Sequence, residues 1–355
     1  MSILNFAAER RDMPPETEQA QESDAGSGAS EPVRPVFILG IMPRCGTNFL
    51  SDLLCLHPDC GSPNPIYEDY LLAHVDLLDK YVKRVSLHWN PEWGVDSTYQ
   101  NSLKRHLGHA MKTFLFRQAS ATVFVSKTPQ VENLDQFPTF FPKARLLILV
   151  RDGRAVIESG INTFRWPWEW ALQQWTRGAR KIIDFENSID GMQFPHLVVR
   201  YEDLVKNLEF EMQKILEFIE LNIDDYDLEY ASQLPVRGSS TLKSGGDSVR
   251  WDVMAKPNAF DPLSRFANWS RAKHERYNWV AKTELEYFGY QPRTWNSANW
   301  AWTVWNRILD ISAIRYTISV PVYEALKRWK RQKRRNRLDQ QLTVDVKLED
   351  GDREC

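Results

Sequence analysis

The chain has 355 residues, of which 43% are hydrophobic, and it carries a formal net charge of −2. This length and composition allow one large domain or two smaller ones with a full core, and the near-neutral charge argues against a nucleic-acid partner. The four cysteines (Cys45, Cys55, Cys60 and Cys355) have spacings typical of neither a zinc site nor a disulfide framework, so we expect a reducing compartment and a cytoplasmic protein.

Residues 1–33 are polar and rich in Glu, Ser, Ala and Gly, and they lack the pattern of a signal peptide. We therefore expect a disordered N-terminal tail. No apolar run reaches the roughly 18 residues that a membrane-spanning helix needs, so none is expected.

Alternating strands and helices are predicted over residues 34–294. Strands are expected at 36–41, 122–125, 145–150 and 196–200. Helices are expected at 47–56, 154–162, 167–187 and 204–219, with a helix or loop at 131–137 and an aromatic-rich helical region at 67–119 that breaks near Asn90 and Pro91. This alternation predicts an α/β fold, in which a P-loop-like central parallel sheet has helices on both faces. Ligands of such sheets bind beyond the carboxyl ends of the strands.

The stretch PRCGTN, residues 43–48, joins the first predicted strand to the first predicted helix. The first amides of a helix have no internal partners, so they form a seat for a phosphate group. ATP-type loops read G-x-x-x-x-G-K-[ST], whereas here Thr47 follows Gly46 and the cation is Arg44, which disfavours a nucleoside triphosphate. The candidate phosphate-binding residues are Arg44, Cys45 through its backbone amide, Gly46, Thr47 and Asn48.

A second strand-to-helix junction lies in LLILVRDGRAVIESG, residues 146–160. Arg151 ends the strand, and Ser159 follows on the next helix, so both side chains can reach one anion there. Two phosphate sites on neighbouring strands indicate a nucleotide with phosphates on both sides of its ribose.

Three segments resemble the PAPS-dependent sulfotransferase family, in which PAPS is 3′-phosphoadenosine-5′-phosphosulfate. PRCGTNFLSDLL is similar to the family's 5′-phosphosulfate loop, LILVRDGRAVIESG to its 3′-phosphate motif, and VVRYEDLV (198–205) to a third recurring segment. FANWSRAKHERYNWVAKTELEYFGY resembles the C-terminal part of the fold, so the likeness extends over residues 35–292. The first loop carries Arg44, and in this respect the sequence is similar to the carbohydrate, tyrosyl-protein and bacterial branches of the family, which use arginine there.

The resemblance implies PAPS as co-substrate, no metal, and transfer of a sulfuryl group to a hydroxyl or amine. It implies a second cation at Lys127, which is otherwise a solvated lysine, and donor contacts at Tyr201. Ser239 and Ser240 belong to the Gly/Ser-rich stretch 237–252, which is either a donor-binding loop or a mobile surface loop. The first candidate for the base that deprotonates the acceptor is Glu68, although this residue could be an ordinary helix-start acid. The alternative bases are Asp69 and His74.

Residues 295–338 are predicted to form an aromatic and basic helical extension, followed by a polar tail at 339–355. This extension begins with one of three tryptophan clusters (89–93, 165–175 and 295–305) and becomes strongly basic between Lys327 and Arg337. It is either an anchor on a membrane surface or a helix packed on the domain with a solvated basic end.

The expected function is transfer of a sulfuryl group from PAPS to a hydroxyl of a carbohydrate, glycolipid or other small acceptor. The alternatives are a tyrosyl-protein-type sulfotransferase and a P-loop-like nucleotide-binding protein or kinase. The oligomeric state stays open.

Overall fold

The computed structural model describes residues 34–117, 121–234, 264–295 and 300–311, together with 329, 332 and 333. Ser239, Ser240, the N-terminal tail and most of the basic run lie outside the described residues.

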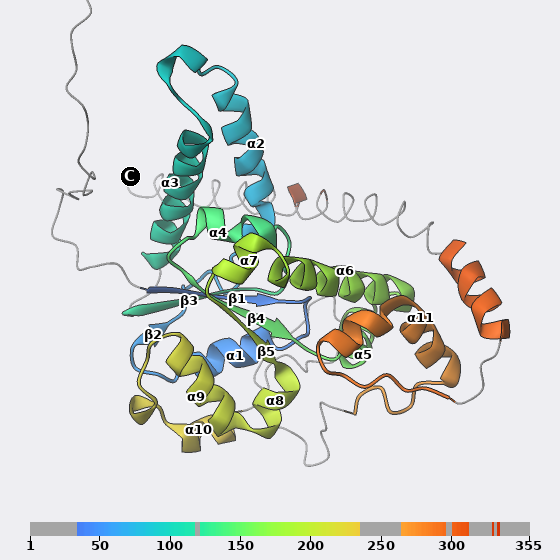
Figure 1. The fold of residues 1–355 in the computed structure, drawn as a ribbon. Coiled ribbons are helices and arrows are strands. Elements are labelled where there is room, and N and C mark those ends of the chain that lie inside the picture. The colour runs from blue at the N-terminus through green and yellow to red at the C-terminus, as the bar shows by residue number, and fades with distance from the viewer. Residues whose placement is uncertain are drawn as a thin grey trace, which may run out of the picture. The chain divides into compact units, whose positions relative to one another are not determined.

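A five-stranded parallel sheet with the order β2-β3-β1-β4-β5 forms the centre of the fold (Figure 1). Its strands are β1 (Arg34–Gly40), β2 (Cys60–Gly61), β3 (Val123–Thr128), β4 (Arg145–Val150) and β5 (His196–Arg200). In the register, Ile38 of β1 lies opposite Lys127 of β3 and Leu147 of β4. The central strands are continuous apolar runs because helices cover both of their faces. The predicted α/β fold with a parallel sheet is confirmed.

Helices cover the sheet on two sides (Figure 1). One side carries α1 (Thr47–Leu54), α8 (Tyr201–Lys206), α9 (Leu208–Phe218) and α10 (Leu228–Gln233). The other side carries α4 (Phe137–Phe140), α6 (Trp168–Glu186) and α7 (Ile189–Gln193). Both α5 (Gly153–Phe164) and α11 (Arg271–Tyr287) pack against α6.

The region between β2 and β3 is a pair of helices that extends away from the sheet (Figure 1). It consists of α2 (Val75–Ser86) and α3 (Ser97–Phe116), and α3 packs on α4. The predicted break at Asn90 and Pro91 lies between these two helices, next to the short 3-10 helix η2 (Pro91–Trp93). The remaining 3-10 helices of the described chain are η1 (Leu72–His74), η3 (Leu134–Gln136) and η4 (Ile223–Asp225).

One local prediction was wrong, and one strand was missed. The helix expected at 204–219 is two helices, α8 and α9, because Asn207 between them adopts φ −129° and ψ 54°, which lies outside the helical region. The strand β2 was not predicted, because its two residues are too few to show a periodicity. In the part of the chain that the structure describes, no helix is both long and apolar enough to cross a bilayer.

Candidate active site at the carboxyl ends of the strands

The four longer strands all end at the same edge of the sheet. β1 lies between β3 and β4 in this sheet, and ligands of such sheets bind beyond the carboxyl ends of the strands. Arg44 follows β1, Lys127 lies near the end of β3, Arg151 follows β4, and Tyr201 follows β5. The residues predicted from separate motifs therefore meet at one edge.

The loop after β1 has a constrained backbone. Arg44 has φ 79° and Gly46 has φ 111°, and the latter is a conformation that side-chain-bearing residues rarely adopt. A Cβ atom on Gly46 would also lie 2.5 Å from the ring of Tyr201. Gly46 is the N-cap of α1, and the first intrahelical bond runs from Leu50 N to Gly46 O, so the preceding amides of the helix point into the loop region. This arrangement is suited to an anion.

Arg44 connects the two predicted phosphate motifs. Its Nε donates a hydrogen bond to Ser159 Oγ on α5 at 3.1 Å, and Arg151 Nη1 donates to the carbonyl oxygen of Arg44 at 3.1 Å. The guanidinium of Arg151 lies over the ring of Tyr201, 4.1 Å from its centroid. The structure thus brings Arg44, Arg151, Ser159 and Tyr201 together.

A third arginine, Arg265, belongs to this group. Burial and the nearby charges of Arg265 and Arg151 lower the pKa of Arg44 to about 10. Burial and the charge of Arg151 likewise lower the pKa of Arg265. Three cations that repel one another in a partly buried site are stabilised by a bound anion.

Arg265 was not predicted from the sequence. The available signal was its position directly before FANWS, where the segment similar to the C-terminal part of sulfotransferases begins.

Tyr201 provides a test of whether a phosphate-bearing ligand fits here. Its side chain is 1% exposed, and its hydroxyl has no hydrogen-bond partner among the described residues. Burial raises its pKa, so the hydroxyl keeps its proton and remains a donor. A buried donor without an acceptor, close to three arginines, fits an absent anionic group.

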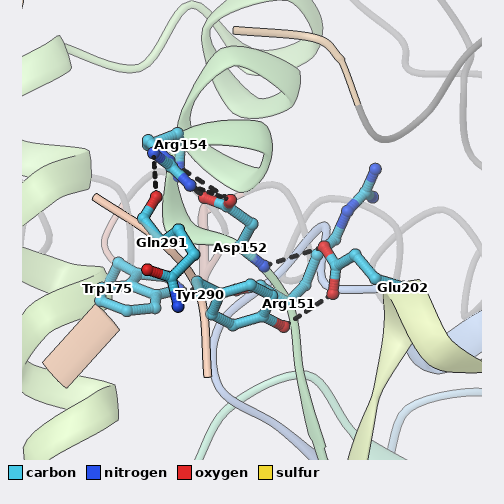
Figure 2. A network of polar contacts seen from close by, with 7 residues as sticks. All are labelled: Arg151, Asp152, Arg154, Trp175, Glu202, Tyr290 and Gln291. Atoms are coloured by element: carbon cyan, nitrogen blue, oxygen red, sulfur yellow. Dashed lines mark hydrogen bonds and ion pairs between the residues drawn. The ribbon is translucent and has the colours of Figure 1, made fainter. Parts of the chain in front are cut away.

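A buried network fixes the backbone at Arg151 (Figure 2). Trp175 Nε1 donates to the carbonyl oxygen of Arg151 at 3.1 Å, and the next amide, Asp152 N, donates to Glu202 Oε1 at 3.0 Å. The other carboxylate oxygen of Glu202 accepts from Tyr290 Oη at 2.6 Å. Figure 2 shows the guanidinium of Arg151 pointing away from this network. The network therefore holds the main chain of Arg151, while the guanidinium group of Arg151 takes no part in it.

Asp152 performs two further tasks in this network. Its carboxylate caps α5 by accepting from Arg154 N at 2.9 Å, and it forms an ion pair with Arg154 Nη2 at 2.6 Å. Arg154 Nη1 in turn donates to the carbonyl oxygen of Gln291 at 3.0 Å (Figure 2). The end of β4 is thus tied to a segment about 140 residues later in the chain.

The candidate bases occupy different surroundings. Asp69 is held against β3, because its carboxylate accepts from Ser126 Oγ, from Thr128 Oγ1 at 3.2 Å and from Leu71 N at 2.8 Å. Burial raises the pKa of Asp69. Glu68 is half-buried and accepts from Tyr70 Oη at 2.8 Å, whereas His74 is exposed.

Lys127 is half-buried on β3. Because side chains alternate along a strand, Lys127 lies on the opposite face from Ser126 and Thr128. Its charge acts on the thiol of Cys55, which follows α1. The structure therefore places Lys127 on the face of α1 and does not bring its side chain together with that of Asp69.

The thiol of Cys45 is fully buried, and burial raises its pKa to about 11. A backbone contribution from this residue therefore remains the simpler prediction. Among the described residues, no group of His, Cys, Asp or Glu side chains could hold a metal ion.

A cavity of about 610 Å³ lies elsewhere, between α11 and the helical residues 300–306. Its wall includes Trp279, Trp295, Trp300 and Trp302 and none of the residues described above.

Comparison with known proteins places this geometry in a family. Protein-tyrosine sulfotransferase A of Caenorhabditis elegans is 26% identical over 222 residues, which cover 55% of this chain and 52% of that protein. Protein-tyrosine sulfotransferase 1 of Danio rerio is 23% identical over 268 residues, which cover 73% of each chain. The chain therefore spans about half the length of the first relative and about three quarters of the second.

Among solved structures, the sulfotransferase domain from the Synechococcus PCC 7002 olefin synthase aligns with a TM-score of 0.44 and 22% identity, covering 73% of this chain and 95% of that domain. The model of the sulfotransferase family matches residues 35–225, which is more than half of the chain. The chain therefore belongs to the sulfotransferase family.

Proposed function

We propose that the protein transfers the sulfuryl group of PAPS to the phenolic hydroxyl of a tyrosyl acceptor. The observation that carries this proposal is the cluster of Arg44, Arg151 and Arg265 near Tyr201, at the carboxyl ends of the strands; the buried hydroxyl of Tyr201 has no partner among the described residues. Family membership supports the reaction class, and it disfavours the alternative of a kinase that shares the loop.

The nucleotide would be held at two ends. Arg151, Ser159 and Arg265 would bind the 3′-phosphate, while Arg44, Thr47, Asn48 and the first amides of α1 would bind the 5′ side. PAPS supplies an activated sulfuryl group whose transfer leaves 3′-phosphoadenosine-5′-phosphate (PAP). The chain contributes fixed cations and amide dipoles, which stabilise the negative charge that develops on the leaving phosphate.

The acceptor hydroxyl must lose a proton, and Glu68 remains the first candidate for the base. Asp69 already accepts from two hydroxyls and one amide, so its oxygens are largely occupied in holding its loop against β3. Glu68 directly precedes Asp69, and its carboxylate accepts one hydrogen bond, from the exposed Tyr70. In this arrangement Asp69 positions the loop, and Glu68 is the carboxylate that is left to take the proton.

The names of the relatives move the proposed acceptor from a carbohydrate or glycolipid to a tyrosyl peptide. Labelled PAPS offered with an acidic tyrosine-containing peptide, a matched peptide with Phe for Tyr, and a panel of glycans would test this. We expect label on the tyrosine peptide only. Label on a glycan and none on either peptide would return the acceptor to the carbohydrate class.

Calorimetry with PAP and with ATP tests the nucleotide site. We expect PAP to bind without magnesium and ATP to bind more weakly, since the site has two separate places for phosphate. Arg151→Ala should weaken PAP binding by about 1.5–3 kcal/mol, the range for hydrogen bonds to charged groups. Arg177→Ala, which removes a half-exposed arginine paired with Glu132, is the control and should bind PAP normally. Equal PAP affinity in the Arg151 variant and the parent would contradict the site.

A further inference from the structure

The helical residues 300–311 follow the family-like region and dock on α11 through one polar side. Arg276 of α11 donates from Nη1 to the carbonyl oxygen of Asn306 at 3.2 Å and pairs with Asp310 Oδ1 at 2.6 Å. Trp279 Nε1 donates to the other oxygen of Asp310 at 2.9 Å. The side of this helix that faces the protein is therefore held by hydrogen bonds and an ion pair.

A second side of this helix is apolar and exposed, and it begins at Trp300, which also borders the cavity next to α11. Its five large side chains have exposed fractions between 48% and 78%, and we call them the Trp300 surface: Trp300, Val304, Trp305, Ile308 and Ile311. With 3.6 residues per turn, these five fall within an arc of about 140°, while Asn306 and Asp310 lie outside it. Single exposed apolar residues are common on proteins, but an apolar strip along one helix indicates a surface that binds something.

The charge that follows this helix indicates what the partner is. Between Lys327 and Arg337, eight of eleven residues are Lys or Arg and none is acidic. Removing these eight positive charges from the net −2 of the chain leaves the rest at −10, so the positive charge is local. Within this run Trp329 is exposed, and Lys333 lies 5.2 Å from its ring centroid.

We propose that the Trp300 surface binds to the surface of an anionic lipid bilayer. Indole and aliphatic side chains along one side of a helix insert at the boundary between headgroups and acyl chains. The eight lysine and arginine residues of the basic run, elsewhere in the same chain, add electrostatic attraction to anionic headgroups. Arg307 is exposed at the edge of the apolar arc, where its long side chain can reach a headgroup phosphate. The protein would then lie on a membrane without spanning it.

Co-sedimentation of the full chain with vesicles tests this proposal. We expect binding to phosphatidylcholine vesicles that contain phosphatidylserine, and at least roughly tenfold weaker binding to phosphatidylcholine alone, with loss at high salt. Replacing the apolar strip in the variant Trp300→Ser, Ile308→Ser, Ile311→Ser should lower binding by at least about tenfold, because binding scales with buried apolar area. Trp93→Ser on η2 removes an indole of similar exposure far along the chain and should bind as the parent does.

A charge-reversal variant, Lys330→Glu, Arg331→Glu, Arg334→Glu, leaves the apolar strip intact. It tests the proposal independently if the serine variant misfolds. It should lose the preference for phosphatidylserine while its thermal unfolding stays unchanged. The proposal is overturned if the parent sediments with neither vesicle or if both variants sediment as the parent does. It is also overturned if light scattering shows a parent dimer that the serine variant dissociates, because the strip would then be an interface between copies.

Discussion

Gly46 follows β1 and Tyr201 follows β5, and the two residues leave no space between them. Gly46 needs a positive φ, and its α-carbon faces the tyrosine ring. One close contact, between Gly46 and the ring of Tyr201, therefore fixes the loop after β1 against the start of α8.

Gly46→Ala should consequently destabilise the protein by about 1–3 kcal/mol and reduce PAP binding, because the new methyl group must displace the ring or the loop. Urea unfolding and calorimetry would measure the two effects. Gly94→Ala is a matched control, because Gly94 also has a positive φ of 70° but a Cβ atom there meets nothing within 4 Å. If both variants lost the same stability and kept PAP binding, the contact with Tyr201 would be unimportant.

Glu68 and Asp69 are adjacent, yet we expect different effects when each carboxylate is replaced by the corresponding amide side chain. Glu68→Gln should lower turnover by roughly 10²–10⁴-fold, the contribution of a general base, while PAP affinity and stability stay unchanged. Asp69→Asn should instead lower the free energy of unfolding by about 1–3 kcal/mol, because two hydroxyls and an amide lose a charged acceptor. Steady-state kinetics and urea unfolding on both variants check this. Near-normal turnover in the Glu68 variant would exclude that residue as the base.

At the scale of elements, the junction of β4 and α5 depends on partners from other elements. The carbonyl of Arg151 is held by α6, the amide of Asp152 by α8, and the side chain of Arg154 by the segment after α11. The junction is rigid because each polar backbone group has a buried partner.

Tyr290→Phe removes one of these supports. The carboxylate of Glu202 would lose a 2.6 Å hydrogen bond inside the protein, which should cost about 1.5–3 kcal/mol of unfolding free energy. Thermal or urea unfolding would measure it. Tyr230→Phe removes an exposed hydroxyl and should change little. Equal stability of the two variants would show that the buried bond contributes nothing.

Elements with a strong local pattern could be predicted from the sequence. The bounds of β4 and β5 agree with the prediction, since an arginine follows the apolar run of β4 and another ends that of β5. The division between α8 and α9 could not be predicted, because it depends on the backbone of one residue within a helical pattern. The tryptophans divide in the same way: Trp175 is fully buried and Trp93 is exposed, although both lie in aromatic clusters. Burial depends on tertiary packing that composition does not reveal.

At the scale of the whole molecule, Arg276 joins three helical segments. It binds Glu169 at the start of α6 through two bonds, of 2.5 and 3.2 Å, and it also holds Asn306 and Asp310. Its own side chain is buried, so these contacts are shielded from solvent.

Arg276→Ala should therefore destabilise the protein by about 3–5 kcal/mol, because it leaves the half-buried carboxylate of Glu169 uncompensated. It should also speed proteolytic cleavage near residues 296–311. Lys282→Ala, whose partner Glu286 lies 3.8 Å away at the surface, is the control and should change stability by less than about 1 kcal/mol. Unchanged cleavage in the Arg276 variant would mean that other contacts hold the last helix.

The part of the site that depends on the tertiary fold could not be predicted from the sequence. Arg44, Arg151, Ser159 and Tyr201 could be proposed from motifs because each follows or adjoins a strand end. Arg265 and Tyr290 were not proposed, since they lie beside or within a segment that has no strand pattern and whose likeness to the family gave them no role. Only the assembled fold shows that the charges of Arg44 and Arg265, more than 200 positions apart, act on one another.

The dependence of the strand ends on Arg265, Tyr290 and Gln291 has a consequence for biosynthesis. All five strands are synthesised by residue 200, but the last partners of Arg154 and Glu202 are synthesised some ninety residues later. The strands of the sheet therefore exist in the nascent chain before the residues that complete the contacts at the ends of β4 and β5. A recombinant fragment that stops at residue 225, where the family match ends, lacks Arg276, Tyr290 and the buried side of α11, so it should be far less stable to urea than the full chain.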